Sequence, residues 1–283
     1  MTLDYRAEPT TAAPPVVDVP PVAARTRRRF RVPRPVRRLA GPVLVLAAWA
    51  LVCATGLVGP QVLPAPWSVL GAGWDLAVSG KLWFHLSASL ERVGLGLVLG
   101  VVLGTALAVA SGFARVGEDL IDSTVQLFKS VPHVALVPLL IVWFGINQEP
   151  RIILITAGVF VPVYINTFSA IRGVDRDLVE AAKAFGATRR MLVTQVVLPG
   201  ALPGFLVGLR FALAAAWLSL VFAETINTNQ GLGYLMSLAQ TLLQTDVMMF
   251  TILTYAVIGL LSYALVKGLE HRLLRWRNGY EGA

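Results

Sequence analysis

Six long apolar segments run through this 283-residue chain, and they restrict it to folds that a lipid bilayer can accommodate. Each has close to the roughly 20 residues that an α-helix needs to cross the hydrocarbon core. The composition agrees, because 56% of the residues are hydrophobic, 14% are charged and the mean hydropathy is +0.69. We expect an all-α, polytopic membrane protein with six transmembrane helices, at residues 39–58, 92–113, 123–144, 151–171, 201–223 and 247–266.

Two of these segments contain residues that predict how they pack. Pro132 and Pro138 lie inside the third segment and predict a broken helix, which a membrane tolerates where the break faces protein or a cavity. The second segment has Gly96, Gly100 and Gly104 at four-residue spacing. Such a stripe permits close approach of a neighbouring helix, so we assign it a packing role.

The basic residues predict the orientation in the membrane. They concentrate in residues 1–38, in the polar loop 173–200 and in residues 271–283, whereas the opposite loops are poor in Lys and Arg. The positive-inside rule then places both termini in the cytoplasm, flanking a six-span domain over residues 39–270. It also explains the net charge of +8 without a nucleic-acid partner. The Pro- and Ala-rich start of the first tail is typical of disorder.

The sequence lacks the residues that several kinds of site require. Cys53 is the only cysteine, which excludes an internal disulfide. Gly80-Lys81 is the only Gly-Lys pair and has no upstream glycine at P-loop spacing, so we expect no ATP site, no catalytic residues and no bound cofactor. Three carboxylates resemble an acidic metal cluster, but a solvated helix start explains them better and no metal site is predicted; they are Glu118, Asp119 and Asp122.

The polar loop 173–200 predicts a helix–turn–helix. Asp177 is a suitable N-cap with Glu180 three residues on, Gly186 supplies a residue that tolerates positive φ, and Thr188 can cap a second helix. Small alanines between them would let another protein approach closely. An ordinary loop helix of a membrane protein is the alternative.

The order of several motifs resembles binding-protein-dependent ABC transporter permeases. Residues 180–182 read Glu-Ala-Ala, Gly186-Ala187 follow, and Leu198-Pro199 and Gly208-Leu209-Arg210 come later. The resemblance covers about residues 63–276 and is strongest to the branch that imports aliphatic sulfonates, taurine and nitrate. Further matches are Pro132 with Pro138, Trp143-Phe144-Gly145-Ile146, Asn166-Thr167, Ile171-Arg172 and Gly231-Leu232-Gly233-Tyr234. Departures are Ala170 and Asn147-Gln148, where the branch usually has Gly and Gly-Glu.

This resemblance implies a type I ABC importer permease fold and a set of partners. Two ATPase subunits would bind ATP and Mg²⁺, an extracytoplasmic binding protein would deliver the substrate, and a second permease copy would complete the pore. A homodimer is expected, although a different permease could be the partner. The residues implied for docking the ATPase are Glu180, Ala181, Ala182, Gly186 and Ala187.

Candidates for the translocation path come from the middle spans. His133, Asn166 and Thr167 are polar residues at membrane depth. Arg210, Trp217 and Glu224 recur at seven-residue intervals and so share one face of the fifth helix. That stripe faces a cavity in one interpretation. In the other, Arg210 pairs with a loop carboxylate or carbonyl near the inner end, Glu224 sits at the outer water interface and His133 is a packed, hydrogen-bonded residue.

The resemblance suggests a small anion as the substrate, and an aliphatic sulfonate in the first place. A cationic residue near the path would favour a sulfonate by Coulomb attraction. Besides Arg151, the cations within or bordering the middle spans are Lys129, Arg92 and Arg210. Taurine, nitrate or a vitamin precursor remain alternatives within the same importer type. A membrane scaffold or channel without an ATPase partner is the alternative from another class of protein.

Overall fold

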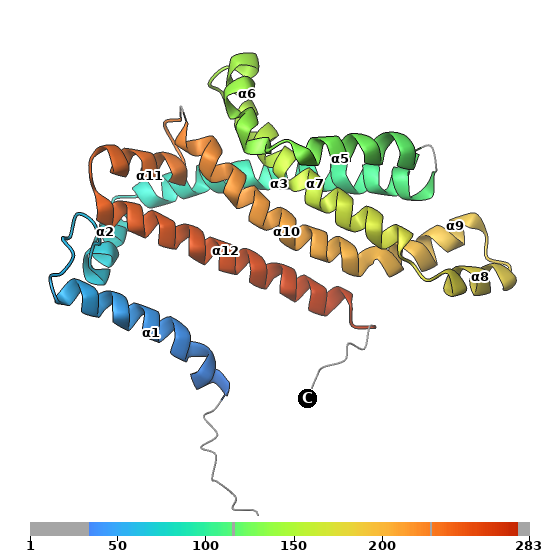
Figure 1. Cartoon of the computed structure of the whole chain (residues 1–283), viewed down its shortest axis with the longest axis horizontal. Helices are drawn as coiled ribbons and strands as arrows, with labels where there is room; N and C mark the ends of the chain where they lie inside the picture. Colours follow the sequence, from blue (N-terminus) through green and yellow to red (C-terminus); the bar gives the residue numbers. More distant parts are fainter. Residues whose placement is uncertain (1–33, 115–116, 227, 277–283) are drawn as a thin grey trace, which may run out of the picture. The chain divides into compact units, whose positions relative to one another are not determined.

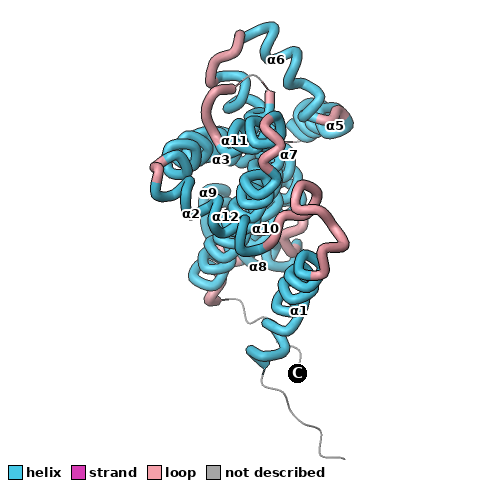
Figure 2. Tube along the Cα trace, turned by 90° about the vertical axis from the view of Figure 1, so that its left-hand side faces the viewer, coloured by secondary structure: helices cyan, strands magenta, loops and turns pink. Residues whose placement is uncertain are grey.

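The structure is a computed structural model that describes residues 34–114, 117–226 and 228–276. It falls into two units, Met1–Val45 and Leu46–Ala283, whose boundary lies inside the first helix. Every regular element in the described residues is helical, and no strand occurs among them (Figure 2). The all-α prediction is therefore confirmed.

The helices follow one another with short connections (Figure 1). In chain order they are α1 (Arg34–Ala54), α2 (Pro66–Val78), α3 (Lys81–Phe113), the π-helix η1 (Glu118–Asp122), α5 (Ser123–Ser130), the 3₁₀ turn η2 (His133–Leu136), α6 (Val137–Phe144), α7 (Glu149–Arg172), α8 (Arg176–Ala184), α9 (Arg189–Met191), the π-helix η3 (Leu192–Val197), α10 (Leu198–Thr225), α11 (Leu232–Thr241) and α12 (Thr245–Leu273).

Three long helices, α3, α7 and α10, form the core of the second unit. Its buried side chains come from all three, with Val93, Ile155, Val159, Ala212 and Leu220 among them. The predicted glycine stripe is the contact surface between α3 and α7. A Cβ on Gly100 would lie 2.6 Å from Val159 Cβ and 2.9 Å from Thr156 O. Only glycine allows the two backbones to approach this closely.

The break predicted in the third span is confirmed. Val131 precedes Pro132 and is extended, with ψ of 124°, as steric conflict with the proline ring requires. The segments Glu118–Ser130 and His133–Phe144 consequently meet at an angle of 81°. α6 is therefore a short apolar helix with its own direction, next to the start of α7 (Figure 1).

The number of spans is not confirmed at six. In the described residues, four helices are long and apolar enough to cross a membrane, namely α3, α7, the continuous stretch Arg189–Thr225, and α12. The bent pair makes five, and Ala40–Ala54 is apolar but shorter. α3 also begins at Lys81 rather than at residue 92, which puts Arg92 inside a helix instead of at its edge.

The two basic tails lie mostly outside the described residues. The predicted tail 1–38 is undescribed up to residue 33, and the predicted tail 271–283 is undescribed from residue 277. Their boundaries and their side of the membrane therefore stay predictions.

Candidate coupling element and transport path

The predicted helix–turn–helix is present, with one correction at its start. The N-cap of α8 is Asp175, whose Oδ1 accepts a hydrogen bond from the Asp177 backbone N–H at 2.9 Å. The predicted cap, Asp177, lies in the first helical turn, where its carboxylate suits the positive end of the helix dipole. The prediction placed the helix start two residues late because both aspartates fit a cap.

The turn between α8 and α9 is built as predicted. Gly186 has φ of +80°, and its backbone N–H donates to Lys183 O at 2.9 Å while Ala187 N–H donates to Ala182 O at 3.0 Å. This pair of bonds is a Schellman motif, which normally requires glycine at that position. Thr188 Oγ1 then accepts from Met191 N–H at 3.3 Å and caps α9.

α8 presents an apolar surface that the sequence analysis missed. No residue of α8 is buried, and Leu178 and Phe185 are 59% and 93% exposed. They stand seven residues apart and so share a face with Ala181 and Ala182. Glu180 and Ala181 are exposed, whereas Ala182 and Ala187 are half-buried. The seven-residue spacing of two large apolar residues in a polar loop was the available signal.

Three polar residues expected in the path have separate hydrogen-bond partners or are packed away. His133 Nε2 is 2.9 Å from Ser219 Oγ, which links η2 to α10. Asn166 Nδ2 donates to Pro162 O at 2.8 Å within α7, and Thr167 is buried. His133 alone among them lines a cavity of about 620 Å³ beside α5 and α7, whose walls are otherwise almost entirely apolar. The packed, hydrogen-bonded interpretation fits His133.

Arg210 and Trp217 face α12. Arg210 Nη2 is 2.5 Å from Glu270 Oε1, and the guanidinium lies 5.3 Å from the centre of the Tyr263 ring. Trp217 Nε1 donates to Ser262 Oγ at 3.1 Å. The expected pairing of Arg210 with a carboxylate is confirmed, but that carboxylate belongs to α12 and not to a loop. These contacts link α10 to α12, so the polar groups of both side chains are engaged by α12.

Glu224 is not at a water interface, so that prediction is wrong. It is fully buried at the end of α10 and lies 2.5 Å from Arg92 Nη1 of α3, and the side chains are 0% and 1% exposed. Ser89 Oγ donates to the same carboxylate at 2.9 Å, as does the Gly233 backbone N–H at 2.9 Å. Burial without these partners would be very costly for a carboxylate.

The same cluster fixes the turn that precedes α11. Arg92 Nη1 also donates to Gln230 O at 2.9 Å, and Leu232 N–H donates to Ser89 Oγ at 2.9 Å. A Cβ on Gly233 would lie 2.6 Å from Glu224 Cβ, which explains a glycine there. Arg92 Nε donates to Gln148 Oε1 at 3.2 Å and so reaches the connection between α6 and α7. The sequence analysis missed this network because its members are far apart in the chain.

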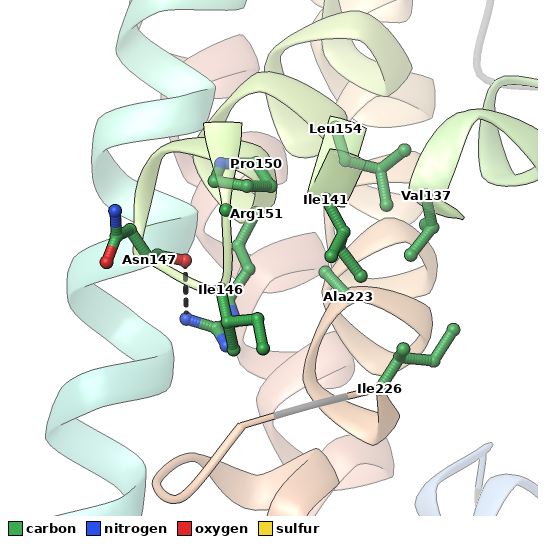
Figure 3. Close-up of a pocket in the computed structure, with 10 residues that line it drawn as sticks. Val137, Ile141, Ile146, Asn147, Pro150, Arg151, Leu154, Ala223 and Ile226 are labelled. Carbon is green, nitrogen blue, oxygen red and sulfur yellow. Dashed lines mark hydrogen bonds between the residues drawn. The ribbon is translucent and has the colours of Figure 1, made fainter. Parts of the chain in front are cut away.

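Arg151 lies beside this cluster at the start of α7. Its Nη1 donates to Asn147 O at 2.7 Å, and it is near enough to Arg92 and Glu224 for both charges to act on it. Figure 3 shows Arg151 at the edge of a small pocket with apolar side chains from α6, α7 and α10 opposite it. The apolar wall is made by Val137, Ile141, Ile146, Pro150, Leu154, Ala223 and Ile226.

The three carboxylates near residue 120 do not converge on a common point. Glu118 Oε2 lies 2.7 Å from Arg172 Nη2, and Asp122 Oδ1 accepts from Tyr164 Oη at 3.4 Å. In the described part of the chain no three His, Cys, Asp or Glu side chains form a group suited to a metal ion.

Comparison with known proteins places this arrangement in a family. Residues 96–275 match the family described as "Binding-protein-dependent transport system inner membrane component". The chain is 44% identical to the "Putative aliphatic sulfonates transport permease protein SsuC" of Escherichia coli, across 84% of this chain and 91% of the relative. The Bacillus subtilis protein of the same description is 40% identical, across 85% and 87%. The E. coli "Taurine transport system permease protein TauC" is 34% identical, across 89% and 94%.

Solved structures support the fold. A chain of "an amino acid ABC transporter with histidines" superposes with a TM-score of 0.58 at 19% identity, covering 66% of this chain and 92% of that one. A chain of the MetNI methionine ABC transporter gives 0.55 at 21% identity, covering 71% and 97%. Such low identities show the fold alone. The family match over most of the apolar region shows more: the chain belongs to the inner-membrane permease components of binding-protein-dependent transport systems.

Proposed function

We propose that this chain is the membrane-spanning subunit of an ATP-driven importer for aliphatic sulfonates. The observation that carries the substrate is the order of identities, with 44% and 40% to two sulfonate permeases against 34% to a taurine permease. A more distant relative, the "Formylaminopyrimidine transport permease protein ThiX" of Halalkalibacterium halodurans, is 29% identical. By the same order, taurine is the second candidate and the formylaminopyrimidine of that relative's name is a third.

The ATPase belongs to a separate polypeptide in this proposal, and α8 is the element that docks into it. Leu178 and Phe185 provide the apolar contact, and the Phe185 side chain is almost fully exposed in this chain. Buried aromatic anchors dominate the energetics of most protein interfaces. This anchor depends on the helix that carries it, on the small residues beside it and on the turn that follows. These features are supplied by Glu180, Ala181, Ala182, Gly186 and Ala187. ATP and Mg²⁺ bind to the partner and not to this chain.

Transport would proceed by alternating access. Closure of the ATPase dimer pulls the two α8 helices together, and the long helices α7 and α10 carry that movement to the opposite end of the bundle. A second copy of this chain completes the pore, and an extracytoplasmic binding protein delivers the solute there. The broken span is a natural moving part, because α6 is separated from α5 by the bend at Pro132.

The charges support an orientation with α8 in the cytoplasm. Arg176, Lys183, Arg189 and Arg190 lie on or beside α8 and α9, whereas α11 and its flanking connections contain no Lys or Arg. The positive-inside rule therefore favours a cytoplasmic α8 end, with both termini on that side, and an external α11 end.

Removal of the exposed aromatic ring tests the coupling role. Phe185→Ala should leave membrane insertion intact, reduce co-purification of the ATPase and abolish uptake of an alkanesulfonate. Phe211→Ala is a matched control, because Phe211 is also exposed, at 58%, but lies on α10. Normal ATPase association and uptake with Phe185→Ala would refute α8 as the docking element. A stable complex of the wild-type chain without any ATPase would favour the scaffold alternative.

A further inference from the structure

We infer that His85 is a positioning residue for α11 and that it makes transport sensitive to acid on the external side. Neutral His85 holds the start of α11 in place, and protonated His85 releases it. The inference rests on the proposed function for its transport readout, whereas the capping of α11 does not depend on the substrate. His85 lies in the second turn of α3, beside the start of α11 (Figure 1).

The first step is the way α11 begins. The first N–H groups of a helix have no partner within that helix, and the N-cap of α11 is Gly231, which has no side chain to supply one. Side chains of α3 and α10 take this role. The bonds run from Gly231 N–H to His85 Nδ1 at 3.2 Å, from Leu232 N–H to Ser89 Oγ at 2.9 Å and from Gly233 N–H to Glu224 Oε2 at 2.9 Å.

The second step is the protonation state that the first of these bonds requires. An imidazole nitrogen accepts a hydrogen bond only when it carries no proton, so the His85 ring is neutral and its proton lies on Nε2. A second proton would go to Nδ1 and face the Gly231 N–H. His85 is only 8% exposed, so water has little room to replace the lost acceptor. The capping role of His85 and its charged state therefore exclude each other.

The third step is the charge around the ring. On α3, Lys81 lies four residues before His85 and Arg92 seven residues after it, so both share its face and oppose a further positive charge. The positive end of the α11 dipole opposes it as well. On α10, the Glu224 carboxylate would favour a charged ring, but it is already paired with Arg92 at 2.5 Å. On α11, Tyr234 contributes a neutral ring whose centre lies 5.6 Å from that of His85.

The fourth step is the lack of room in the turn before α11. A Cβ on Gly231 would collide with the Glu224 carboxylate, and Gln230 O accepts from Arg92 Nη1 at 2.9 Å. The turn therefore packs directly on the ion pair that joins α3 to α10. Loss of the His85 bond cannot be absorbed by a small shift there, so we expect protonation to release the start of α11. In the proposed orientation this is the external end, where the binding protein delivers the solute.

Two substitutions of His85 test the inference. His85→Asn puts an amide oxygen close to the place of Nδ1 and does not titrate, whereas His85→Phe keeps a ring without an acceptor. Proteoliposomes hold the complete complex with ATP at about pH 7.5 inside, and the external pH is lowered from about 7.5 to about 5.0. Wild-type uptake of an alkanesulfonate should fall by about threefold or more, because neutral imidazole is lost over this range. His85→Asn should give a nearly flat profile, and His85→Phe should be low throughout.

His271→Asn is the matched control, because His271 is exposed in the last turn of α12, at the opposite end of that helix from α11. It should retain the acid loss of the wild type. The same acid loss in an active His85→Asn would overturn the inference, since the binding protein and the ATPase are identical in both reactions. A flat wild-type profile would overturn it as well.

Hydrogen exchange in the purified complex of permease and ATPase separates this inference from the proposed function, because it needs no substrate. After correction for the intrinsic effect of pH, the α11 amides of the wild type should exchange several-fold faster at about pH 5.0 than at about pH 7.5, and those of His85→Asn should not. That result in a complex that takes up no alkanesulfonate would refute the proposed function and leave the cap standing. Equal protection of wild-type α11 at both pH values would refute the cap, whatever solute is transported.

Discussion

Arg92 Nη1 and Glu224 Oε1 lie 2.5 Å apart although the two residues are 132 positions apart in the chain. The pair joins the first half of α3 to the end of α10 and, through Gln230 and Gly233, holds the turn that leads into α11. It therefore sets the geometry of the end of the bundle opposite α8. Buried pairs of this kind do not add much stability in themselves, but they penalise any state that separates the partners.

Removing one charge of this pair should destabilise the protein strongly. Glu224→Gln keeps an acceptor oxygen for Ser89 and Gly233 but leaves Arg92 as an uncompensated buried charge. We expect a loss of about 3–5 kcal/mol, the usual cost of breaking a buried ion pair. Thermal unfolding of the purified protein in mild detergent measures it. The double change Arg92→Met with Glu224→Gln should cost less than Glu224→Gln alone, and a larger, additive loss would contradict the pairing.

The glycine stripe of α3 gives a second prediction with an internal control. Gly100→Ala places a methyl group against Val159 and the Thr156 carbonyl, so it should push α3 away from α7 and cost about 1–3 kcal/mol. Gly94→Ala, on the same helix, has open space around the new methyl. It should be neutral or stabilising by up to about 1 kcal/mol, because alanine favours helix. Equal effects of the two changes in thermal unfolding would show that the stripe is not a close contact.

The turn after α8 depends on backbone conformation and not on space. Nothing lies within 4 Å of a Cβ built on Gly186, but its φ of +80° is unfavourable for other residues. Gly186→Val should cost about 1–2 kcal/mol locally and redirect α9. The chain should still insert, while ATPase co-purification and uptake fall. Gly186→Asn, which tolerates this region better, should retain more of both, and the reverse order would argue against the turn as the coupling geometry.

Glu180→Lys should weaken the ATPase association by inverting a charge on the docking helix.

Arg210 should behave as a packing residue. Its pair with Glu270 is partly exposed, at 37% and 21%, so Arg210→Gln should cost no more than about 1 kcal/mol. The KM for an alkanesulfonate should change little, because Arg210 is already engaged by Glu270 and Tyr263. A large increase of KM in Arg210→Gln, with normal insertion and ATPase association, would return Arg210 to the path.

Local features of this structure could be predicted because their causes lie within a few residues. The bend of the third span follows from Pro132, and the Schellman turn follows from Gly186. The start of α8 was less certain, since Asp175 and Asp177 are equally good caps and only the observed backbone separates them. The face of α10 that carries Arg210 was predicted, but which helix it meets depends on tertiary packing.

The buried cluster could not be predicted, for the same reason. Arg92 looked like the edge of a span because α3 begins earlier than the apolar run, and Glu224 looked like the end of one. A sequence pattern within one segment does not show that the ends of two segments meet in the fold, or that their contact excludes water. The exposure of Phe185, the C-cap residue of α8, could not be predicted either, because a large apolar residue at the end of a short helix packs against its own chain in many folds.

Uptake by the reconstituted complex tests the central claim most directly. Proteoliposomes containing this chain and its ATPase, with ATP inside and the cognate binding protein outside, are given a labelled alkanesulfonate, taurine, nitrate or a pyrimidine vitamin precursor in separate reactions. The account predicts accumulation of the alkanesulfonate that requires both ATP and the binding protein, and that is lost with Phe185→Ala. Accumulation of the vitamin precursor without any of the sulfonate would contradict the substrate, and sulfonate passage that needs no ATP would contradict the importer itself.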